Sequence, residues 1–351
     1  MRMLGLEIDR CHLIAVRNDE EKGLRLSYHN LVSLLANRHW AIVRAHLTAR
    51  KLLNAGLCLL EFRLHRVVLR SRPLYLKVET TDCCNLRCQH CHDGSVPRHN
   101  GFLDFDVYTR LLDQLSPTLL EVSLYDQGEP LLDPRIVEYI QYASQRNVGT
   151  VISSNFSMPL SDEMLARLVC SGLDYLQVAI DGLSQEIYGQ YRRGGQLERV
   201  LDNLKRLLRI RRELGSAAPR IEWQMIDFPF NRHEQQAARA LAAELGVDRF
   251  LLKPDCYSTY PAPDYRRRSR CSLPWFSCAV ECDSKLSACF IKDDETLDIG
   301  QLDHSSFDRL WNSATCRALR SRRFPAADDD DGYCARCNRF DGRAGSAYTN
   351  R

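Results

Sequence analysis

The chain has 351 residues, of which 44% are hydrophobic and 26% are charged. This length is sufficient for one large α/β domain with a smaller appendage, and the apolar content is sufficient for a buried core. No apolar run is long enough to span a membrane, and the amino terminus lacks the pattern of a secretory signal. We therefore expect a cytoplasmic globular protein without a transmembrane segment, and the net charge of +3 does not by itself indicate a partner.

Residues 1–73 carry an excess of positive charge, with thirteen Lys or Arg and six Asp or Glu. Two patterns of helical period lie in this segment, from Leu31 to Leu53 and from Leu57 to Leu69. We predict a helical arm that packs on the main domain with its charges in water; binding to a membrane, a nucleic acid or a substrate peptide is the alternative. Because aromatic and basic residues are not interleaved here, we do not expect a nucleic-acid partner.

From Leu74 the pattern changes to short β-like runs that alternate with segments of helical period. The alternation predicts a parallel sheet, closed or partly closed into a barrel over residues 74–256. Residues typical of helix starts precede the helical segments, namely Asp104, Pro134, Ser161, Asp162, Ser184 and Asn231 ahead of Glu234. The predicted strands are Leu74–Thr80, Leu119–Tyr125, Val148–Ser153, Asp174–Ile180, Ile221–Ile226 and Arg249–Lys253.

Four polar or glycine-bearing motifs follow the first four predicted strands. They are CNLRCQHC at residues 84–91, DQGEP at 126–130, SSN at 153–155 and AIDG at 179–182. Because parallel strands present their carboxyl ends at one edge of the sheet, we expect the four motifs to converge there.

The first motif contains three thiols at a regular spacing, at Cys84, Cys88 and Cys91, whereas Cys83 does not fit that spacing. In a reducing compartment, clustered cysteines are more often metal ligands or catalytic thiols than disulfides. A structural zinc site needs four ligands. A 4Fe–4S cluster held by three thiolates instead leaves one iron open to a substrate or cofactor, and we favour this interpretation.

This arrangement resembles the radical SAM superfamily, in which CxxxCxxC follows the first strand of a partial (β/α)6 TIM-type barrel. The resemblance implies that Cys84, Cys88 and Cys91 ligate a 4Fe–4S cluster whose open iron binds S-adenosylmethionine. It also implies a one-electron reductant such as flavodoxin or ferredoxin. His90 stands where an aromatic residue commonly lies beside the adenine, and an imidazole can stack there. Arg192, in IYGQYRRGG, resembles an arginine that pairs with the cofactor carboxylate, because a planar guanidinium suits bidentate binding.

Two further motifs resemble family elements that contact S-adenosylmethionine. Gly128, Glu129 and Pro130 match the GEP element, which meets the ammonium of the methionine moiety with backbone and acid groups. Ser153 and Asn155 are placed like residues that hydrogen-bond the ribose or the carboxylate. On its own, a GEP tripeptide would indicate only a turn, and a Ser/Asn pair would indicate only a polar loop.

A second group of cysteines lies in residues 257–351. Cys271, Cys289, Cys334 and Cys337 supply four thiolates, with a predicted β-hairpin and the helix SSFDRLWNSATCRALRSRR between them. The Pro-Trp after the first cysteine, the LWNS helix and the closing CxxC resemble the SPASM/twitch extension of radical SAM enzymes. Because no cysteine follows Cys337 in the sequence, the twitch form with one fully ligated auxiliary 4Fe–4S cluster fits best.

The C-terminal segment departs from the resemblance at the hairpin. Ser284 occupies the turn position where the extension usually has glycine. Cys278 and Cys282 compete as ligands, and zinc in a four-cysteine lobe is the alternative to a cluster.

The resemblance implies radical chemistry. The reduced first cluster passes one electron to the sulfonium, and the resulting 5′-deoxyadenosyl radical removes hydrogen from an unactivated carbon. A closed second cluster is suited to accept the electron left on the substrate, as in twitch dehydrogenases that oxidise an aminocyclitol alcohol. Cys256, if it faces the cavity, is a candidate hydrogen-atom donor that would give an epimer, and a buried packing role is the alternative.

We therefore predict a radical SAM oxidoreductase that dehydrogenates or epimerises a small polar substrate of the sugar or aminocyclitol type. A maturase of a ribosomally synthesised peptide, with the basic arm as a docking surface, is one alternative. A non-catalytic zinc or iron–sulfur protein is another. Likeness of fold does not identify the substrate.

Overall fold

The computed structural model describes residues 40–89, 91, 101–255, 271–289, 297–303 and 306–321. Within these residues, one sheet contains β1 (Tyr75–Val78), β2 (Glu121–Ser123), β3 (Gly149–Ser154), β4 (Tyr175–Ala179), β5 (Arg220–Asp227), β6 (Arg249–Pro254), β7 (Ser277–Val280), β8 (Lys285–Ser287) and β9 (Asp298–Gln301). Its strand order is β6-β5-β4-β3-β2-β1-β7-β8-β9. The pairs from β6 to β7 are parallel, and β8 is antiparallel to both β7 and β9.

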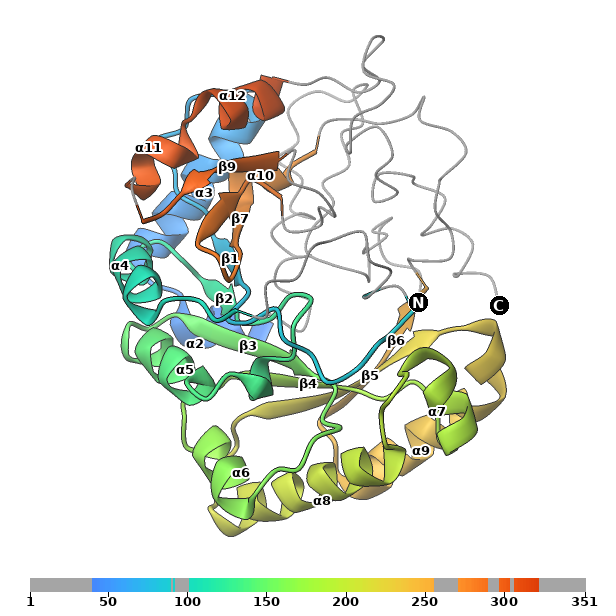
Figure 1. The fold of residues 1–351 in the computed structure, drawn as a ribbon. Helices are drawn as coiled ribbons and strands as arrows, with labels where there is room; N and C mark the ends of the chain where they lie inside the picture. The colour runs from blue at the N-terminus through green and yellow to red at the C-terminus, as the bar shows by residue number, and fades with distance from the viewer. Residues whose placement is uncertain are drawn as a thin grey trace, which may run out of the picture.

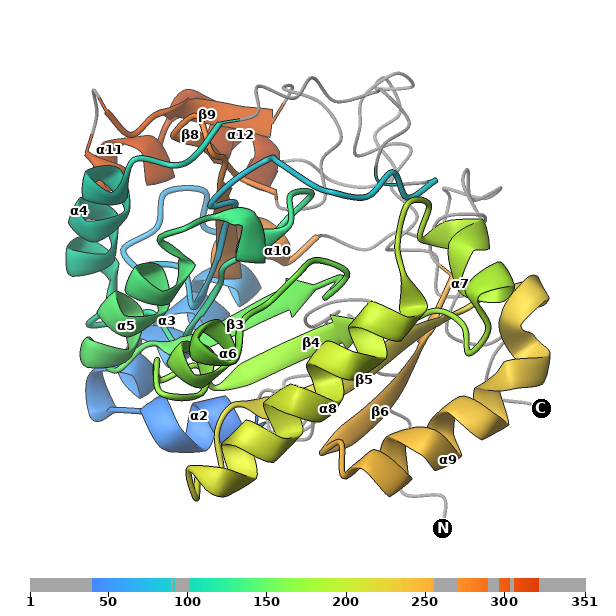
Figure 2. The same cartoon turned by 60° about the horizontal axis from the view of Figure 1, so that its bottom comes forward.

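Helices cover the convex side of this curved sheet, as Figures 1 and 2 show for α4, α5, α6, α8 and α9. The helices are α2 (Trp40–His46), α3 (Ala49–Arg63), α4 (Phe105–Leu115), α5 (Ile136–Gln145), α6 (Asp162–Val169), α7 (Gln185–Tyr191), α8 (Leu197–Glu213), α9 (Gln235–Leu245), α10 (Leu273–Phe276), α11 (Phe307–Trp311) and α12 (Ala314–Ser321), with 3-10 turns η1 (Pro130–Leu132) and η2 (Pro229–Glu234). The described part of the sheet is open, with β6 and β9 at its edges. The predicted partial (β/α)6 barrel is confirmed.

All six predicted strands are present, with bounds that differ from the prediction by a few residues at most. The side chains of Asp104, Ser161 and Ser184 cap α4, α6 and α7 by accepting a hydrogen bond from a backbone N–H of the first turn. The prediction for Asn231 is wrong. Its side chain is buried inside η2, where its amide donates to the carbonyls of Asp181 and Ile226, and α9 begins only at Gln235.

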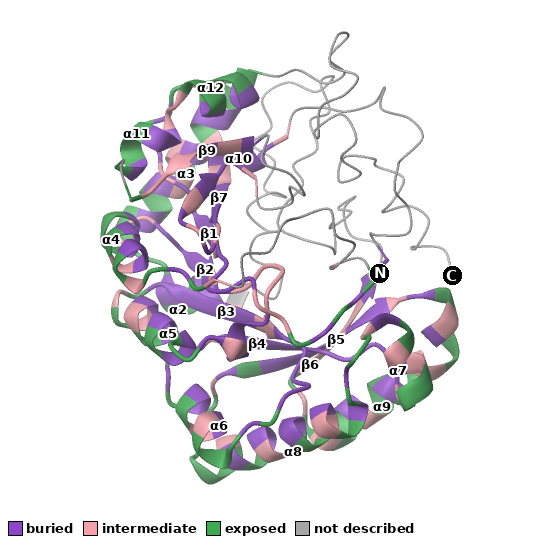
Figure 3. Cartoon of the chain, viewed as in Figure 1, coloured by how far each residue is buried: buried purple, intermediate pink, exposed green. Residues whose placement is uncertain are grey.

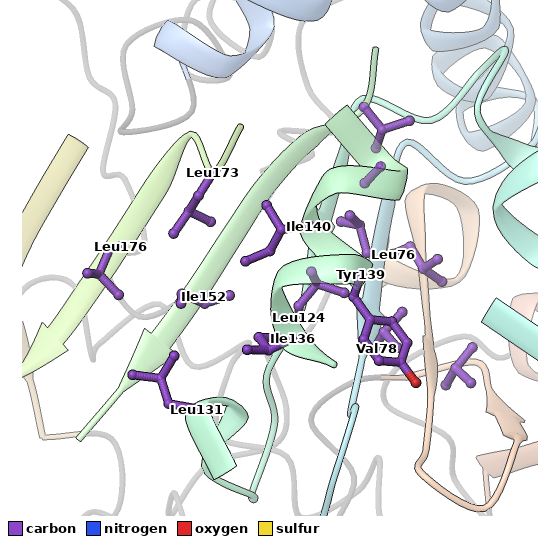
Figure 4. Close-up of a cluster of buried hydrophobic side chains, with 14 of the residues drawn as sticks. Leu76, Val78, Leu124, Leu131, Ile136, Tyr139, Ile140, Ile152, Leu173 and Leu176 are labelled. Carbon is purple, nitrogen blue, oxygen red and sulfur yellow. The ribbon is translucent and has the colours of Figure 1, made fainter. Parts of the chain in front are cut away.

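The main core lies between the convex side of the sheet and the helices. Alternate strand residues such as Leu76, Val78, Ile152 and Leu176 pack there, together with apolar residues of α5 (Figure 4). Figure 3 shows the strands buried and the outward faces of α6 and α8 exposed. The core therefore fixes which strand residues face the concave side.

The concave side of the sheet is polar. Gln177 on β4 accepts a hydrogen bond from the hydroxyl of Tyr125 at 3.2 Å and donates to Glu222 on β5 at 2.7 Å. Tyr175 also donates to Glu222, at 3.2 Å. Lys77 on β1 pairs with Asp126 after β2. Buried polar groups of this kind are stable only with such partners, so the inner wall is a connected network.

The amino-terminal helices close the amino end of the sheet. Ile42 of α2 packs against Val151 and Tyr175 on the inner face. His46 Nε2 donates to Asp174 Oδ1 at 2.9 Å, just before β4. The described part of the predicted arm is therefore packed on the sheet, although the break between the helices falls at residues 47–48, where Thr48 caps α3, and not near Leu57.

The carboxyl-terminal elements continue the sheet, because β7 pairs in parallel with β1. The predicted hairpin is formed by β7 and β8, and Ser284 in its turn has a φ of 68°, in the left-handed region where glycine costs least. The predicted single helix is divided into α11 and α12. The intervening Asn312 side chain exchanges hydrogen bonds with the backbone N–H and carbonyl of Leu69. The domain boundaries at residues 73/74 and 256/257 stay predictions.

Candidate functional site

The loop after β1 carries three thiols into one small apolar cluster. Cys88 is buried within this cluster, which also contains Leu86, Tyr191, Ile226 and Phe228. The other two cysteines of the motif, Cys84 and Cys91, are half-buried and pack against it. All three thiols therefore share one environment at the carboxyl edge of the sheet.

Each thiol has a polar contact from a different loop. The amide of Asn155, after β3, points to the sulfur of Cys84 at 3.9 Å. The guanidinium Nη1 of Arg192, after β4 and α7, lies 3.9 Å from the sulfur of Cys88. The Cys91 thiol points to the carbonyl of Gln127, after β2, at 3.6 Å. The loops that follow the first four strands therefore meet at the three cysteines.

This donor set fits an iron–sulfur cluster held by three thiolates. Among the residues that the structure describes, no group of three or more His, Cys, Asp or Glu is already placed to hold a metal ion. The sulfurs of Cys84 and Cys88 nevertheless face N–H groups, which stabilise thiolates and tune bound clusters. The ligand roles of the three cysteines stay predictions that this geometry supports.

The Gly128 loop lies directly against the backbone before the cysteines. A Cβ at Gly128 would lie 1.8 Å from the carbonyl oxygen of Thr81, so the close approach requires glycine. The backbone N–H groups of Gln127 and Gly128 donate to Glu79 Oε1 at 3.1 and 3.3 Å. Burial, aided by Asp126, raises the pKa of Glu79 to about 8.

Glu79 is a residue of this site that the sequence patterns did not predict. Its signal is weak, because it is a single acid between an apolar strand and the cysteine motif. Its position, one residue after β1 and one residue away from the core-facing Val78, places it on the inner face.

Glu129 is a buried acid that joins two loops. Its Oε2 accepts a hydrogen bond from the backbone N–H of Asn155 at 2.8 Å, and its Oε1 accepts one from Leu131 at 3.1 Å. Burial raises its pKa to about 7. Pro130, also buried, begins η1. The predicted contact of Glu129 with the ammonium of S-adenosylmethionine stays a prediction.

The SSN motif divides its side chains between two faces of β3. Ser153 is half-buried on the inner face, opposite Gln177 of β4, whereas the hydroxyl of Ser154 accepts a hydrogen bond from Phe156 on the other face. Asn155 donates to Asn85 Oδ1 at 2.9 Å, which ties this loop to the cysteine loop. Within the described contacts, Asn155 reaches the thiols and Ser153 does not.

Arg192 is held by a fully buried acid. Its Nε donates to Asp181 Oδ2 at 2.6 Å, and the second carboxylate oxygen of Asp181 accepts from the backbone N–H of Ile226 at 2.6 Å. Burial opposes the charge of Arg192, but Asp181 outweighs it and the pKa of Arg192 rises further above its usual value. Asp181 belongs to the AIDG motif, whose position after β4 was noted without a role for the acid. The pairing of Arg192 with a cofactor carboxylate stays a prediction.

The carboxyl-terminal cysteines differ in their surroundings. Cys271 and Cys289 are half-buried and pack against the same small cluster, formed by Leu273 and Ala279. Cys278 and Cys282 are buried, and desolvation raises the pKa of both thiols. Four further predicted site residues, His90, Cys256, Cys334 and Cys337, lie outside the described residues.

The sequence matches two family models. Residues 78–216 match the radical SAM superfamily, and residues 271–338 match the SPASM iron-sulfur cluster-binding domain. The chain therefore contains a radical SAM domain, followed by a carboxyl-terminal SPASM-type region. These two domains imply S-adenosylmethionine and a 4Fe–4S cluster in the barrel, and auxiliary iron–sulfur chemistry in the carboxyl-terminal region.

Several curated proteins are similar to part of the chain. A tungsten-containing aldehyde ferredoxin oxidoreductase cofactor-modifying protein from Pyrococcus furiosus is 29% identical over 184 residues, which are 51% of this chain and 50% of that protein. The mycofactocin maturase MftC from Mycobacterium ulcerans is 31% identical over 135 residues, which are 38% of this chain and 36% of the relative. The chain thus spans half or less of the length of these relatives.

The fold is similar to that of Streptococcus suis SuiB, solved bound to its precursor peptide SuiA. The match has a TM-score of 0.59 at 14% identity, and covers 78% of this chain and 72% of that one. At this identity the likeness concerns the fold alone.

In the described residues, no helix is both long and apolar enough to cross a bilayer.

Proposed function

We propose that this protein is a radical SAM enzyme that reductively cleaves S-adenosylmethionine and removes hydrogen from a polar substrate. The observation that carries the proposal is the convergence of Asn155, Arg192 and the Gln127 carbonyl on the thiols of the CxxxCxxC loop. A lone CxxxCxxC has other uses, such as zinc binding. Here the loops that follow three further strands reach the three thiols, so the motif is part of a larger polar site at the carboxyl edge of the sheet.

The chain's own residues hold and orient the cofactors in this proposal. Cys84, Cys88 and Cys91 hold the cluster, which when bound supplies the electron that splits the sulfonium of S-adenosylmethionine. Arg192, fixed by Asp181, directs a positive charge at the sulfur of Cys88 and offsets the negative charge of a thiolate-held cluster. The loop N–H groups held by Glu79 keep the GEP backbone in place against Thr81.

The polar inner wall supports a small polar substrate of the sugar or aminocyclitol type. Glu222 is fully buried with Tyr175, Gln177 and Arg249 as its partners, whereas Lys77, Ser153 and Gln224 on the same inner face keep part of their surface exposed. Hydroxyl and amino groups of a substrate would find acceptors and donors along this wall. We propose oxidation as the outcome, with the auxiliary cluster as electron acceptor, and epimerisation as the variant outcome if Cys256 donates a hydrogen atom.

A second candidate function is maturation of a ribosomally synthesised peptide. It is favoured by the similarity to the maturase MftC and by the SuiB-like fold. The two functions share the cleavage step and differ in the substrate.

Reductive cleavage tests the shared step. The protein is reconstituted anaerobically with iron and sulfide, reduced with dithionite and supplied with S-adenosylmethionine, and 5′-deoxyadenosine is measured by chromatography. We expect deoxyadenosine and a change in the electron paramagnetic resonance of the reduced cluster when S-adenosylmethionine is added. A preparation that binds zinc alone, or a cluster whose spectrum does not respond, would contradict the proposal and favour a non-catalytic metal protein.

The reaction products distinguish dehydrogenation, epimerisation and peptide maturation. A carbonyl product without solvent deuterium indicates dehydrogenation, whereas deuterium uptake at one carbon that is lost in Cys256→Ala indicates epimerisation. Turnover with a precursor peptide, and none with polyols or aminocyclitols, indicates the maturase. Cys289→Ala should spare deoxyadenosine formation and reduce product if the auxiliary cluster accepts an electron. Cys278→Ala is the control that should retain product, because Cys278 lies in the main core, whereas Cys271 and Cys289 pack with Ala279 on the other face of β7.

A further inference from the structure

Helix α3 is oriented with polar residues inward and leucines outward. Lys51, Asn54 and Glu61 are buried on its inner face. On the opposite face, the exposed fractions are 51% for Leu52, 75% for Leu53, 53% for Leu60 and 58% for the C-cap Leu64. Leu53, Leu60 and Leu64 follow one another at spacings of seven and four residues, so they form one continuous face. Cys58 and Phe62 are also buried on the inner face, so α3 carries apolar side chains on both faces.

The buried polar residues fix this orientation. Asn54 donates to the carbonyl of Arg72 at 2.8 Å and accepts from its backbone N–H at 3.0 Å. Glu61 accepts from the backbone N–H of Arg70 at 2.8 Å and from that of Ser71 at 3.1 Å. Lys51 donates to the carbonyl of Asn147. Rotating α3 to bury its leucines would leave all of these buried groups without partners, which is costly, so the exposure of the leucines is set by the fold.

Within residues 40–73, the exposed charged side chains are all basic, and Arg72 at the end of this segment pairs with Asp308 of α11. Glu61 is the only acid in residues 40–73, and it is buried with both oxygens in use. The exposed basic residues of the same segment include Arg44, Arg50, Arg63, Arg66 and Arg70. The surface therefore combines protruding leucines with cations, and a complementary partner must be both apolar and anionic.

We propose that the exposed face of α3 docks on an anionic lipid bilayer. A helix surface is convex, whereas an acidic amphipathic peptide would be recognised in a groove. Leucine side chains on a convex ridge can enter the acyl boundary of a membrane while flanking arginines contact lipid phosphates. The protein would then lie on the membrane surface through α3, with the amino end of its sheet toward the lipid.

This orientation leaves the carboxyl edge of the sheet accessible. α3 meets the sheet through Asn147, two residues before β3, whereas the three thiols lie beyond the opposite end of the strands. The proposal concerns a surface and does not depend on the reaction that the thiols serve.

Vesicle binding of the full chain tests the proposal. Vesicles of equimolar phosphatidylcholine and phosphatidylglycerol are compared with pure phosphatidylcholine by flotation. We expect binding to the anionic vesicles, and a loss of at least about tenfold in partitioning for Leu53→Glu with Leu60→Glu, because burying one leucine already contributes that factor. The matched control is Leu214→Glu, which changes a leucine of similar exposure (50%) after α8 and should leave binding unchanged.

Several outcomes would overturn the proposal. These are no binding by the wild type, equal binding to uncharged vesicles, or an equal loss in Leu214→Glu. A wild-type dimer that the double variant dissociates would assign the face to a second copy, and capture of an acidic amphipathic peptide without vesicle binding would assign it to a peptide. A lowered unfolding temperature in the double variant, without vesicle binding by the wild type, would show that the chain itself covers these leucines.

Discussion

The two ends of the parallel sheet use the same kinds of buried polar side chain for different purposes. At the carboxyl end, Glu79 and Glu129 accept hydrogen bonds from backbone N–H groups of loops, and Asp181 accepts from Arg192 and from the N–H of Ile226 near the end of β5. These contacts hold the site around the thiols. At the amino end, His46 and Asp174 join α2 to the start of β4 and close the barrel. In this molecule, the acids beyond the carboxyl ends of the strands hold the site, whereas the half-buried Asp174 at the start of β4 anchors α2.

The largest effect is expected at the thiols. Cys88→Ala should abolish deoxyadenosine formation, because two thiolates cannot hold the cluster in the proposed geometry. The measurement is deoxyadenosine per reconstituted chain. Cys83→Ala, at the neighbouring free and half-buried thiol, is the control that should remain active. Equal activity in the two variants would contradict the role of Cys88 as a cluster ligand.

Asp181→Asn should cost stability at the carboxyl end. It leaves the Arg192 guanidinium without its charge partner in a site where the acid is fully buried, and such a loss costs about 3–5 kcal/mol in free energy of unfolding. Urea denaturation measures the change. The exposed pair of Arg135 and Glu138 provides the comparison, because Arg135→Ala there should cost less than about 1 kcal/mol. Similar losses in free energy of unfolding for the two variants would contradict the role of Asp181 as the buried charge partner of Arg192.

A methyl group at Gly128 should displace the GEP loop. Because its Cβ would collide with the Thr81 carbonyl, the loop must move by more than an ångström, and misplacement of this size costs roughly a hundredfold in rate. Gly189→Ala is the matched control, since its Cβ would meet nothing nearer than 3.6 Å in α7. Cleavage rates of the two variants are compared at equal cluster content, and a fully active Gly128→Ala would contradict the close approach.

The smallest effect is expected at the amino end and depends on pH. Both ring nitrogens of His46 face oxygen acceptors, on Asp174 and Asn147. Burial lowers the pKa of His46, but the hydrogen bond and charge of Asp174 outweigh it, and the net change is upward from 6.5. A raised pKa contributes stability that is fully present below the unfolded value and is lost as pH rises through the folded value.

His46→Gln should therefore be less stable than the wild type by about 1 kcal/mol below pH 6.5, with a difference that shrinks at alkaline pH. Unfolding free energies of the wild type and of His46→Gln, measured from below pH 6.5 to alkaline pH, check the prediction. Asp113→Asn, at an exposed pair with Arg146, should show no such trend near neutrality. A difference that grows with pH would show that His46 is neutral in the fold.

Regular sequence patterns made much of the fold predictable. Contacts between residues that are far apart in the chain could not be predicted from such patterns. The strands were found because apolar runs and capping residues such as Asp104 and Ser161 are local signals. Glu79 and Asp181 were missed as positioning residues because their partners lie 48 and 45 residues away in the chain. Asn231 resembled a cap, but its partners are the backbone of other segments. The outward position of the α3 leucines has the same cause, since Lys51 and Asn54 find backbone partners in other segments.

The parallel pairing of β7 with β1 has a mechanical consequence. Backbone hydrogen bonds run from Leu74 to Phe276 and from Glu79 to Val280, so the strand that leads to the first cysteine motif is also the neighbour of the carboxyl-terminal hairpin. A continuous ladder resists hinge motion between the two. In the proposed function, such a ladder would keep the distance between the two iron–sulfur centres constant throughout turnover, and electron tunnelling slows steeply with that distance.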